Sequence, residues 1–170
     1  MEIKLRRLVG ANVLLDVMRH CWDTKKLSDL NRLYASNDSI LEIPEWLAIC
    51  TAPRSVAMQL ETHKKKHRFY LFMESGRPDR ATSEFQKAYS RQQEVRFAFL
   101  FTARAIIDIA HYRLCKKAEQ PTREFMALLK DRLREDEPEL ARLLIPMCAF
   151  RNGLCTELHS CQNPMPYPTL

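Results

Sequence analysis

The stretch from Gln59 to Arg68 combines polar and cationic side chains that could bind an anionic ligand. Residues three and four apart lie on the same face of a helix, so Gln59 and His63 are expected to point the same way. His63 is followed directly by a run of lysines at the end of the predicted helix. These side chains could bind a phosphate or pyrophosphate. A solvated basic helix end, where cations complement the helix dipole, is the alternative interpretation.

Ser75-Gly76-Arg77 is a second candidate phosphate site. A small hydroxyl, a glycine that allows close approach and a guanidinium that forms paired hydrogen bonds all suit a phosphate. The same tripeptide also suits an ordinary turn after a strand. The chain has only 3 glycines and contains neither a G-x-G-x-x-G nor a Walker A sequence. We therefore expect side chains, rather than a glycine-rich loop, to hold any phosphate.

Arg104 and Arg113 lie in the most apolar segment of the chain. Nine positions correspond to two and a half helical turns, so the two side chains would not share a helix face. An unpaired buried cation is very costly, so each arginine is expected to have a partner. That partner is either an intramolecular carboxylate or a ligand that more than one subunit contacts.

Three cysteines, Cys148, Cys155 and Cys161, lie in the segment 146–170, near His159. Their spacing does not match the paired C-x-x-C motifs of structural zinc sites, so free, paired and zinc-bound cysteines all remain open. His111 and Cys115, four residues apart, could ligate a metal from one helix face, but core packing of a neutral His and a thiol is the favoured interpretation. No G-x-S-x-G or H-E-x-x-H motif indicates a hydrolase.

The composition is that of a folded, basic protein. The chain has 170 residues, 46% of them hydrophobic, and a formal net charge of +6. This length supports a real hydrophobic core, and the apolar fraction excludes disorder over most of the chain. No stretch approaches the roughly 20 apolar residues of a membrane span, and no signal-peptide core follows the first residues. We expect a cytoplasmic protein with reduced thiols and an anionic partner.

Hydrophobic periodicity predicts a helix-dominated α+β domain with a small antiparallel sheet. Strands are expected at 1–9, 40–51 and 68–73, and helices at 11–22, 28–34, 54–65, 82–117, from 121 onward and at 138–144. The segment 82–117 lacks Pro and Gly and is apolar on most sides, which predicts a central helix in the domain or in an oligomer interface. The domain is expected to span 1–145, followed by a Cys- and Pro-rich tail at 146–170.

Taken together, the first half of the chain resembles the flavin-dependent thymidylate synthases. The opening MEIKLRRLVG…VMRHCWD is similar to the first strand and helix of that family. The segment Asn37-Asp-Ser-Ile-Leu-Glu42 is similar to its His-x-Ser/Thr-x-x-Glu. The segment from Arg54 to Lys64 resembles the helix that carries the family's Arg-His-Arg, which stands here as Thr62-His63-Lys64.

The second half continues the resemblance. Glu74-Ser-Gly-Arg77 resembles the Ser-x-Arg-Tyr end of the family signature. Thr102-Ala-Arg104 is similar to the family's Asn-x-Arg, and Arg113-Leu114 to its Leu-Arg-Leu step. The tail from Pro146 is similar to the Cys-rich ends of some phage-type members.

The resemblance implies an enzyme that reductively methylates dUMP to dTMP, with FAD as cofactor and NADPH and methylenetetrahydrofolate as co-substrates. It also implies a homotetramer with active sites shared between subunits, in the cytoplasm of a bacterium or of a phage-infected host. The residues at flavin-contacting positions are Asn37, Thr62, His63, Lys64, Thr102 and Arg104. Those at dUMP-binding positions are Gln59, Ser75, Gly76, Arg77 and Arg113. Catalytic positions correspond to Arg113 and Asn37.

Two alternatives to this enzyme remain open from the sequence. One is a diverged homologue that binds or modifies pyrimidine nucleotides without the standard activity. The other is a nucleic-acid-binding module, in which the basic run Lys64–Arg68 meets phosphates while Phe69 and Tyr70 stack on bases. The resemblance favours dUMP over nucleic acid as the partner.

Overall fold

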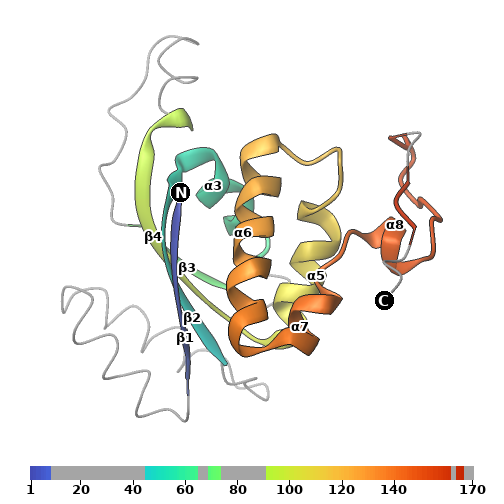
Figure 1. The fold of residues 1–170 in the computed structure, drawn as a ribbon. Helices are drawn as coiled ribbons and strands as arrows, with labels where there is room; N and C mark the ends of the chain where they lie inside the picture. Colours follow the sequence, from blue (N-terminus) through green and yellow to red (C-terminus); the bar gives the residue numbers. More distant parts are fainter. Residues whose placement is uncertain (9–44, 65–68, 74–90, 162–163, 167–170) are drawn as a thin grey trace, which may run out of the picture.

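The structure is a computed structural model of the 170-residue chain. It describes residues 1–8, 45–64, 69–73, 91–161 and 164–166 (Figure 1). The helices predicted at 11–22 and 28–34 therefore lie outside the described residues, as does the turn predicted around Ser75.

The described strands form one antiparallel sheet in the order β1-β2-β4-β3. The strands are β1 (Glu2–Arg7), β2 (Trp46–Pro53), β3 (Tyr70–Met73) and β4 (Glu94–Phe101). In the register of the sheet, Ile3 lies opposite Cys50, and Cys50 lies opposite Phe97. All three side chains are buried. The prediction of an α+β domain with a small antiparallel sheet is confirmed.

Helices cover one face of this sheet (Figure 1). The described helices are α3 (Arg54–Glu61), α5 (Ala103–Arg113), α6 (Gln120–Asp136), α7 (Pro138–Leu143) and α8 (Met147–Phe150). The helices predicted to begin at 54, near 121 and at 138 are confirmed, although α3 ends earlier than expected. α6 packs against β1 and α3, whereas α8 contacts α5 and lies farthest from the sheet. None of the described helices has the length and apolar character needed to cross a membrane.

The helix predicted over 82–117 is wrong over Glu94–Phe101 and confirmed over Ala103–Arg113. Residues 94–101 form β4, and α5 begins only after it. The prediction used apolar residues four positions apart, such as Val95 and Phe99. A spacing of four is close to one helical turn, but it is also two repeats of a strand, so this spacing does not distinguish the two. The buried set in the structure includes Phe97 and Phe101 on the same face, which is the period of a strand.

An aromatic cluster forms the core between the sheet and the helices. Phe99 of β4 is at its centre, with ring centroids 4.8 Å from Phe69, 5.2 Å from Phe101 and 6.2 Å from Phe125. Phe125 belongs to α6, whose buried stripe consists of Thr122, Phe125, Met126, Leu129 and Leu133. This stripe follows helical periodicity and turns one side of α6 toward the sheet. The cluster therefore fixes α6 against β4.

Thr102 marks the boundary between β4 and α5. Its Oγ1 accepts a hydrogen bond from the backbone N–H of Ala105 at 3.2 Å, which satisfies a donor that would otherwise be unpaired at the helix start. Arg104 follows on the first turn and is exposed. Its charge is hydrated there, so the expectation that Arg104 needs a partner to offset burial is wrong. Arg113, at the other end of α5, is partly buried.

Candidate functional site

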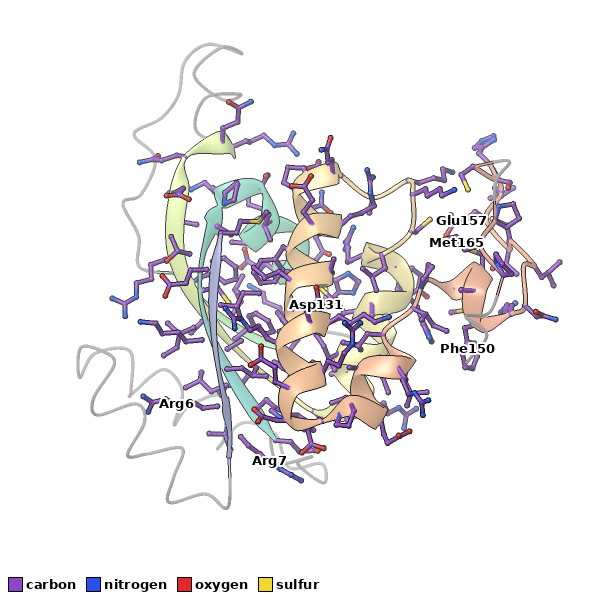
Figure 2. All side chains as sticks on the ribbon, viewed as in Figure 1. Arg6, Arg7, Asp131, Phe150, Glu157 and Met165 are labelled. Carbon is purple, nitrogen blue, oxygen red and sulfur yellow. The ribbon has the colours of Figure 1, made fainter. Side chains whose placement is uncertain are left out.

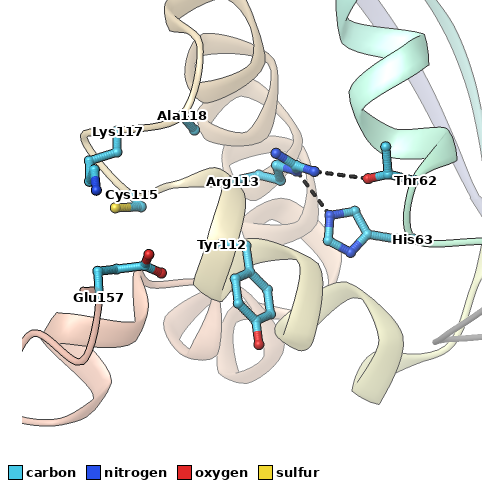
Figure 3. A pocket seen from close by; sticks show the side chains of 8 residues that line it. All are labelled: Thr62, His63, Tyr112, Arg113, Cys115, Lys117, Ala118 and Glu157. Carbon is cyan, nitrogen blue, oxygen red and sulfur yellow. Dashed lines mark hydrogen bonds between the residues drawn. The ribbon is translucent and has the colours of Figure 1, made fainter. Parts of the chain in front are cut away.

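The ends of two helices bring together residues that are far apart in the sequence. α3 ends at Glu61, and the chain then turns, with the N–H of His63 donating to the carbonyl of Leu60 at 3.0 Å. α5 ends at Arg113 beside this turn (Figure 3). His63 and Arg113, which are 50 positions apart, are therefore neighbours.

Arg113 connects the two helix ends through its guanidinium. Its Nε donates to Nε2 of His63 at 2.9 Å, and its Nη2 donates to Oγ1 of Thr62 at 2.9 Å. The Thr62 hydroxyl in turn donates to the carbonyl of Gln59 at 2.8 Å. Because Nε2 of His63 accepts, the proton of a neutral imidazole lies on Nδ1. Arginine has five N–H donors, so about three remain for a ligand after these two bonds.

A cavity of about 490 Å³ opens beside this pair (Figure 3). Its lining consists of Thr62, His63, Tyr112, Arg113, Cys115, Lys117, Ala118 and Glu157. The rings of His63 and Tyr112 lie 6.1 Å apart between centroids and are tilted by 33°. This volume is in the range of small-molecule sites. Rings beside cationic donors suit a planar ligand that carries carbonyl or phosphate oxygens.

The side chains that line the cavity carry more positive than negative charge. Arg113 and Lys117 line it as cations, and Glu157 is the acidic residue among the lining side chains. Partial burial lowers the pKa of the Arg113 guanidinium, and the nearby Glu119 carboxylate opposes this shift. An arginine stays cationic at neutral pH even so. The lining therefore favours an anionic or carbonyl-rich ligand.

Three of the residues assigned from the sequence, Thr62, His63 and Arg113, meet at this cavity. Lys64 does not line it; this lysine is paired with Glu61 at 2.5 Å. Gln59 is also not in the lining.

The amide of Gln59 is held at a second junction between elements. Its Nε2 donates to Oε1 of Glu119 at 3.3 Å, and the same oxygen accepts from Nη2 of Arg91 at 2.6 Å. Gln59 therefore ties the end of α3 to the start of α6, one turn away from the cavity.

Thr102 and Arg104 lie at the opposite end of α5 from the cavity. Arg104 and Arg113 are nine positions apart, which is about 14 Å along a helix axis at 1.5 Å per residue. These two residues are not among those that line the cavity. Asn37, Ser75, Gly76 and Arg77 lie outside the described residues, as does most of the basic run 64–68.

Sequence reasoning missed Tyr112, Lys117 and Glu157 as parts of this site. Tyr112 precedes Arg113 directly, and its exposure at 50% is a signal that only the structure provides. Glu157 comes from the tail beyond α8, and no local pattern links it to α5. Its position depends on tertiary packing, in which Nζ of Lys117 donates to the carbonyl of His159.

His111 and Cys115, four residues apart in the sequence, lie in different surroundings. His111 is buried at 6% exposure, and its ring lies 4.9 Å from that of Phe150 in α8. Cys115 lies beyond the end of α5 and lines the cavity instead. The interpretation of His111 as a core residue is confirmed. Among the described residues, no group of three or more His, Cys, Asp or Glu side chains could hold a metal, and the described cysteines are free thiols.

Because His111 is buried, we expect the folded protein to lose stability in mild acid. Burial lowers the pKa of its imidazole below the ordinary 6.5, and Asp108 partly opposes this. The unfolded chain then binds a proton more readily than the folded protein, so the free energy of unfolding falls as the pH drops below about 6.5. One such group contributes a slope of at most about 1.4 kcal/mol per pH unit.

Urea unfolding between pH 7.5 and 5.5 measures this effect. The matched variant His111→Gln keeps a polar side chain of similar size but cannot titrate. We expect the wild type to lose more stability over this range than His111→Gln. Equal pH slopes for the two proteins would contradict the assignment to His111.

No protein-family model matches the chain. No curated protein matches it either.

Proposed function

We propose that the chain is a flavin-dependent thymidylate synthase-like enzyme that binds dUMP at the cavity beside Arg113. The observation that carries the proposal is the pair of hydrogen bonds from Arg113 to His63 and Thr62. The resemblance assigns His63 and Thr62 to the flavin and Arg113 to the uracil carbonyls. A flavin and its substrate must lie in contact to react. The adjacency of these side chains is what that assignment requires, and it joins residues that are 50 positions apart.

The residues of the cavity fit a planar, carbonyl-rich group. Arg113 has free N–H donors for the carbonyl oxygens of a pyrimidine, and the ring of Tyr112 provides a face for stacking. A guanidinium also stabilises negative charge that develops on a ring oxygen during reaction. Lys117 provides a second cation for a phosphate. These contacts support dUMP as the ligand.

The same lining fits one edge of a flavin. Thr62 and His63 would hold it, with the imidazole oriented by its bond to Arg113. When bound, FAD supplies the hydride and electron transfer of the reaction. The contribution of the chain is to orient the two ring systems against each other and to balance their charge.

The positions of Thr102 and Arg104 support active sites that are shared between subunits. Both correspond to flavin-contacting positions of the family, but along α5 Arg104 lies about 14 Å and Thr102 about 17 Å from Arg113. One copy of the chain cannot easily bring both ends of α5 to the same flavin ring. In the proposed homotetramer, a second subunit supplies Thr102 and Arg104 to a cavity formed by Thr62, His63 and Arg113 of the first.

Ligand binding by the purified protein tests the proposal. We expect visible flavin absorbance, or its appearance on addition of FAD, and binding of dUMP by isothermal titration calorimetry. Formation of dTMP from dUMP, methylenetetrahydrofolate and NADPH then tests turnover. Deoxyuridine is the matched control ligand, because it has the same ring without the phosphate and should bind more weakly.

The outcomes separate the alternatives. Binding of dUMP without dTMP formation would support a diverged nucleotide-binding homologue. A colourless protein that takes up neither FAD nor dUMP would contradict the proposal. Salt-dependent binding to single-stranded nucleic acid in that case would support the nucleic-acid-binding module.

A further inference from the structure

The sheet has an outer face, which points away from the helices. Side chains alternate along each strand, so residues that alternate with the core residues Ile3 and Cys50 lie on this outer face. Arg6 of β1 is one of them and points away from the helices in Figure 2. At one end of the outer face, Leu47 and Leu100 lie opposite each other and are buried. That end is therefore closed to a ligand.

The other end of the outer face is open and contains a cavity of about 300 Å³. Its lining consists of Glu2, Lys4, Ile49, Thr51 and Arg96. Three neighbouring strands supply these residues, because Thr51 of β2 lies opposite both Glu2 of β1 and Arg96 of β4 in the register. None of them lines the cavity beside Arg113. The outer-face cavity is therefore separate from the cavity assigned to dUMP.

The two cations of the outer-face cavity are free to bind a ligand. Nζ of Lys4 lies 3.6 Å from Oε1 of Glu2, and both side chains are exposed, at 73% and 64%. An exposed pair of this kind contributes little to stability, so an anion can take the place of Glu2 at low cost. Arg96 is exposed, and among the described residues its guanidinium has no ion pair or hydrogen bond. Its five N–H donors therefore remain for a ligand.

The polar groups of the lining come from adjacent strands. Neighbouring strands lie about 4.8 Å apart, so β1 and β4 are separated by about 10 Å, with Thr51 of β2 between them. The long side chains of Lys4 and Arg96 can reach toward each other over this distance, and the Thr51 hydroxyl is a further donor. Ile49, which is half-buried, is the apolar residue of the lining. A fork of N–H donors, an ammonium and a hydroxyl around one small cavity suit the oxygens of a phosphate group.

We propose that the outer-face cavity binds the phosphate group of a small phosphorylated molecule. Arg96 and Lys4 hold the phosphate oxygens, and Glu2 gives up its pair with Lys4 to the ligand. A volume of about 300 Å³ is at the lower end of small-molecule sites. A nucleic-acid strand needs a groove that follows its backbone and aromatic rings that stack on its bases. The residues that line this cavity include no aromatic ring, and the buried pair Leu47 and Leu100 ends the open surface, so a small ligand fits better than a strand.

NMR titration of the full chain with pyrophosphate locates the site without any variant. We expect the backbone amide signals of Lys4, Thr51 and Arg96 to shift together as pyrophosphate is added. Shifts confined to the residues around Arg113, or no shift at all, would overturn the proposal. Because this measurement is local and uses neither flavin nor dUMP, its failure is distinguishable from the failure of the proposed function.

Two variants with opposite expected effects test the charges of the cavity, with the affinity taken from the shift of the Thr51 amide. Arg96→Gln removes the guanidinium and should weaken pyrophosphate binding about tenfold or more. Glu2→Gln removes the competing carboxylate and should tighten binding several-fold. Both residues are exposed, so we expect both variants to fold as the wild type does. Wild-type affinity in Arg96→Gln, or weaker binding in Glu2→Gln, would overturn the proposal.

A control variant and a second ligand complete the test. Arg142→Gln makes the same change on α7, where the exposed arginine pairs with Glu139, and should leave the affinity for pyrophosphate unchanged. An equal loss in Arg142→Gln and Arg96→Gln would show that only net charge matters and would overturn the proposal. A single-stranded octathymidylate should shift the Thr51 amide less than pyrophosphate does at the same concentration. Tighter binding of the oligonucleotide at these residues would overturn the assignment to a small ligand in favour of a nucleic-acid strand.

Discussion

Arg113→Ala is expected to lose dUMP binding while the protein remains folded. Truncating a partly buried, hydrogen-bonded charge that contacts a ligand costs about 2–5 kcal/mol, which is a loss of affinity of roughly 30-fold to several thousand-fold. The change also removes the hydrogen bonds to His63 and Thr62, so it affects the positions of the two side chains that would hold the flavin in the proposed enzyme. Titration calorimetry with dUMP measures the loss directly.

Two further variants make this result specific. Arg113→Lys retains the charge but not the planar fork that reaches His63 and Thr62 together, so we expect an intermediate affinity. Arg132→Ala removes the same charge from an exposed position on α6, where the arginine pairs with Glu135, and should bind dUMP as the wild type does. Wild-type affinity in a folded Arg113→Ala protein would contradict the assignment of Arg113 to the nucleotide.

Phe99→Ala is expected to cause the largest loss of stability among the described residues of β4. Its ring is fully buried and lies within 6.3 Å, between centroids, of those of Phe69, Phe97, Phe101 and Phe125. Removing a ring of this kind costs about 3–5 kcal/mol, from the lost transfer energy and the cavity that remains. This is a large part of the roughly 5–15 kcal/mol that stabilises a typical domain.

Chemical unfolding followed by circular dichroism measures this loss. Leu158→Ala is the matched control, because Leu158 is 99% exposed and its truncation should change stability by less than about 0.5 kcal/mol. A loss below about 1 kcal/mol for Phe99→Ala would contradict its central place in the core.

Helices and strands are predictable from the sequence where the position of a proline and the hydrophobic periodicity agree. Pro53, Pro121 and Pro138 each mark a helix start that the structure contains, because proline suits the first turn and no later one. The segment around Phe99 failed because its apolar residues satisfy a spacing of four, which suits a helix and a strand equally. Only pairing with β2 and β3 on either side decides between them, and pairing is a long-range property.

The candidate site also has features that the sequence predicts and others that depend on how the helices pack. The residue types and the family resemblance identify Arg113 and His63 as candidate binding residues. Their hydrogen bond is not predictable in this way, because it depends on where α3 and α5 end in space. The resemblance places Thr102 at a cofactor position, and the structure adds that its hydroxyl caps α5. Glu157 enters the cavity through contacts of the tail that no local pattern encodes.

The sequence by itself determined the class of fold, the starts of the described helices α3, α6 and α7, and the residue types that could hold an anionic nucleotide. These properties follow from local propensity, hydrophobic pattern and side-chain chemistry, which neighbouring residues carry. The tertiary structure alone decided which of those side chains meet, that Arg104 and Arg113 separate to opposite ends of one helix, and that the tail closes on the cavity. Such contacts depend on how the sheet and helices pack, because burial of Phe99 and its neighbours selects one arrangement of elements among many that the local signals allow.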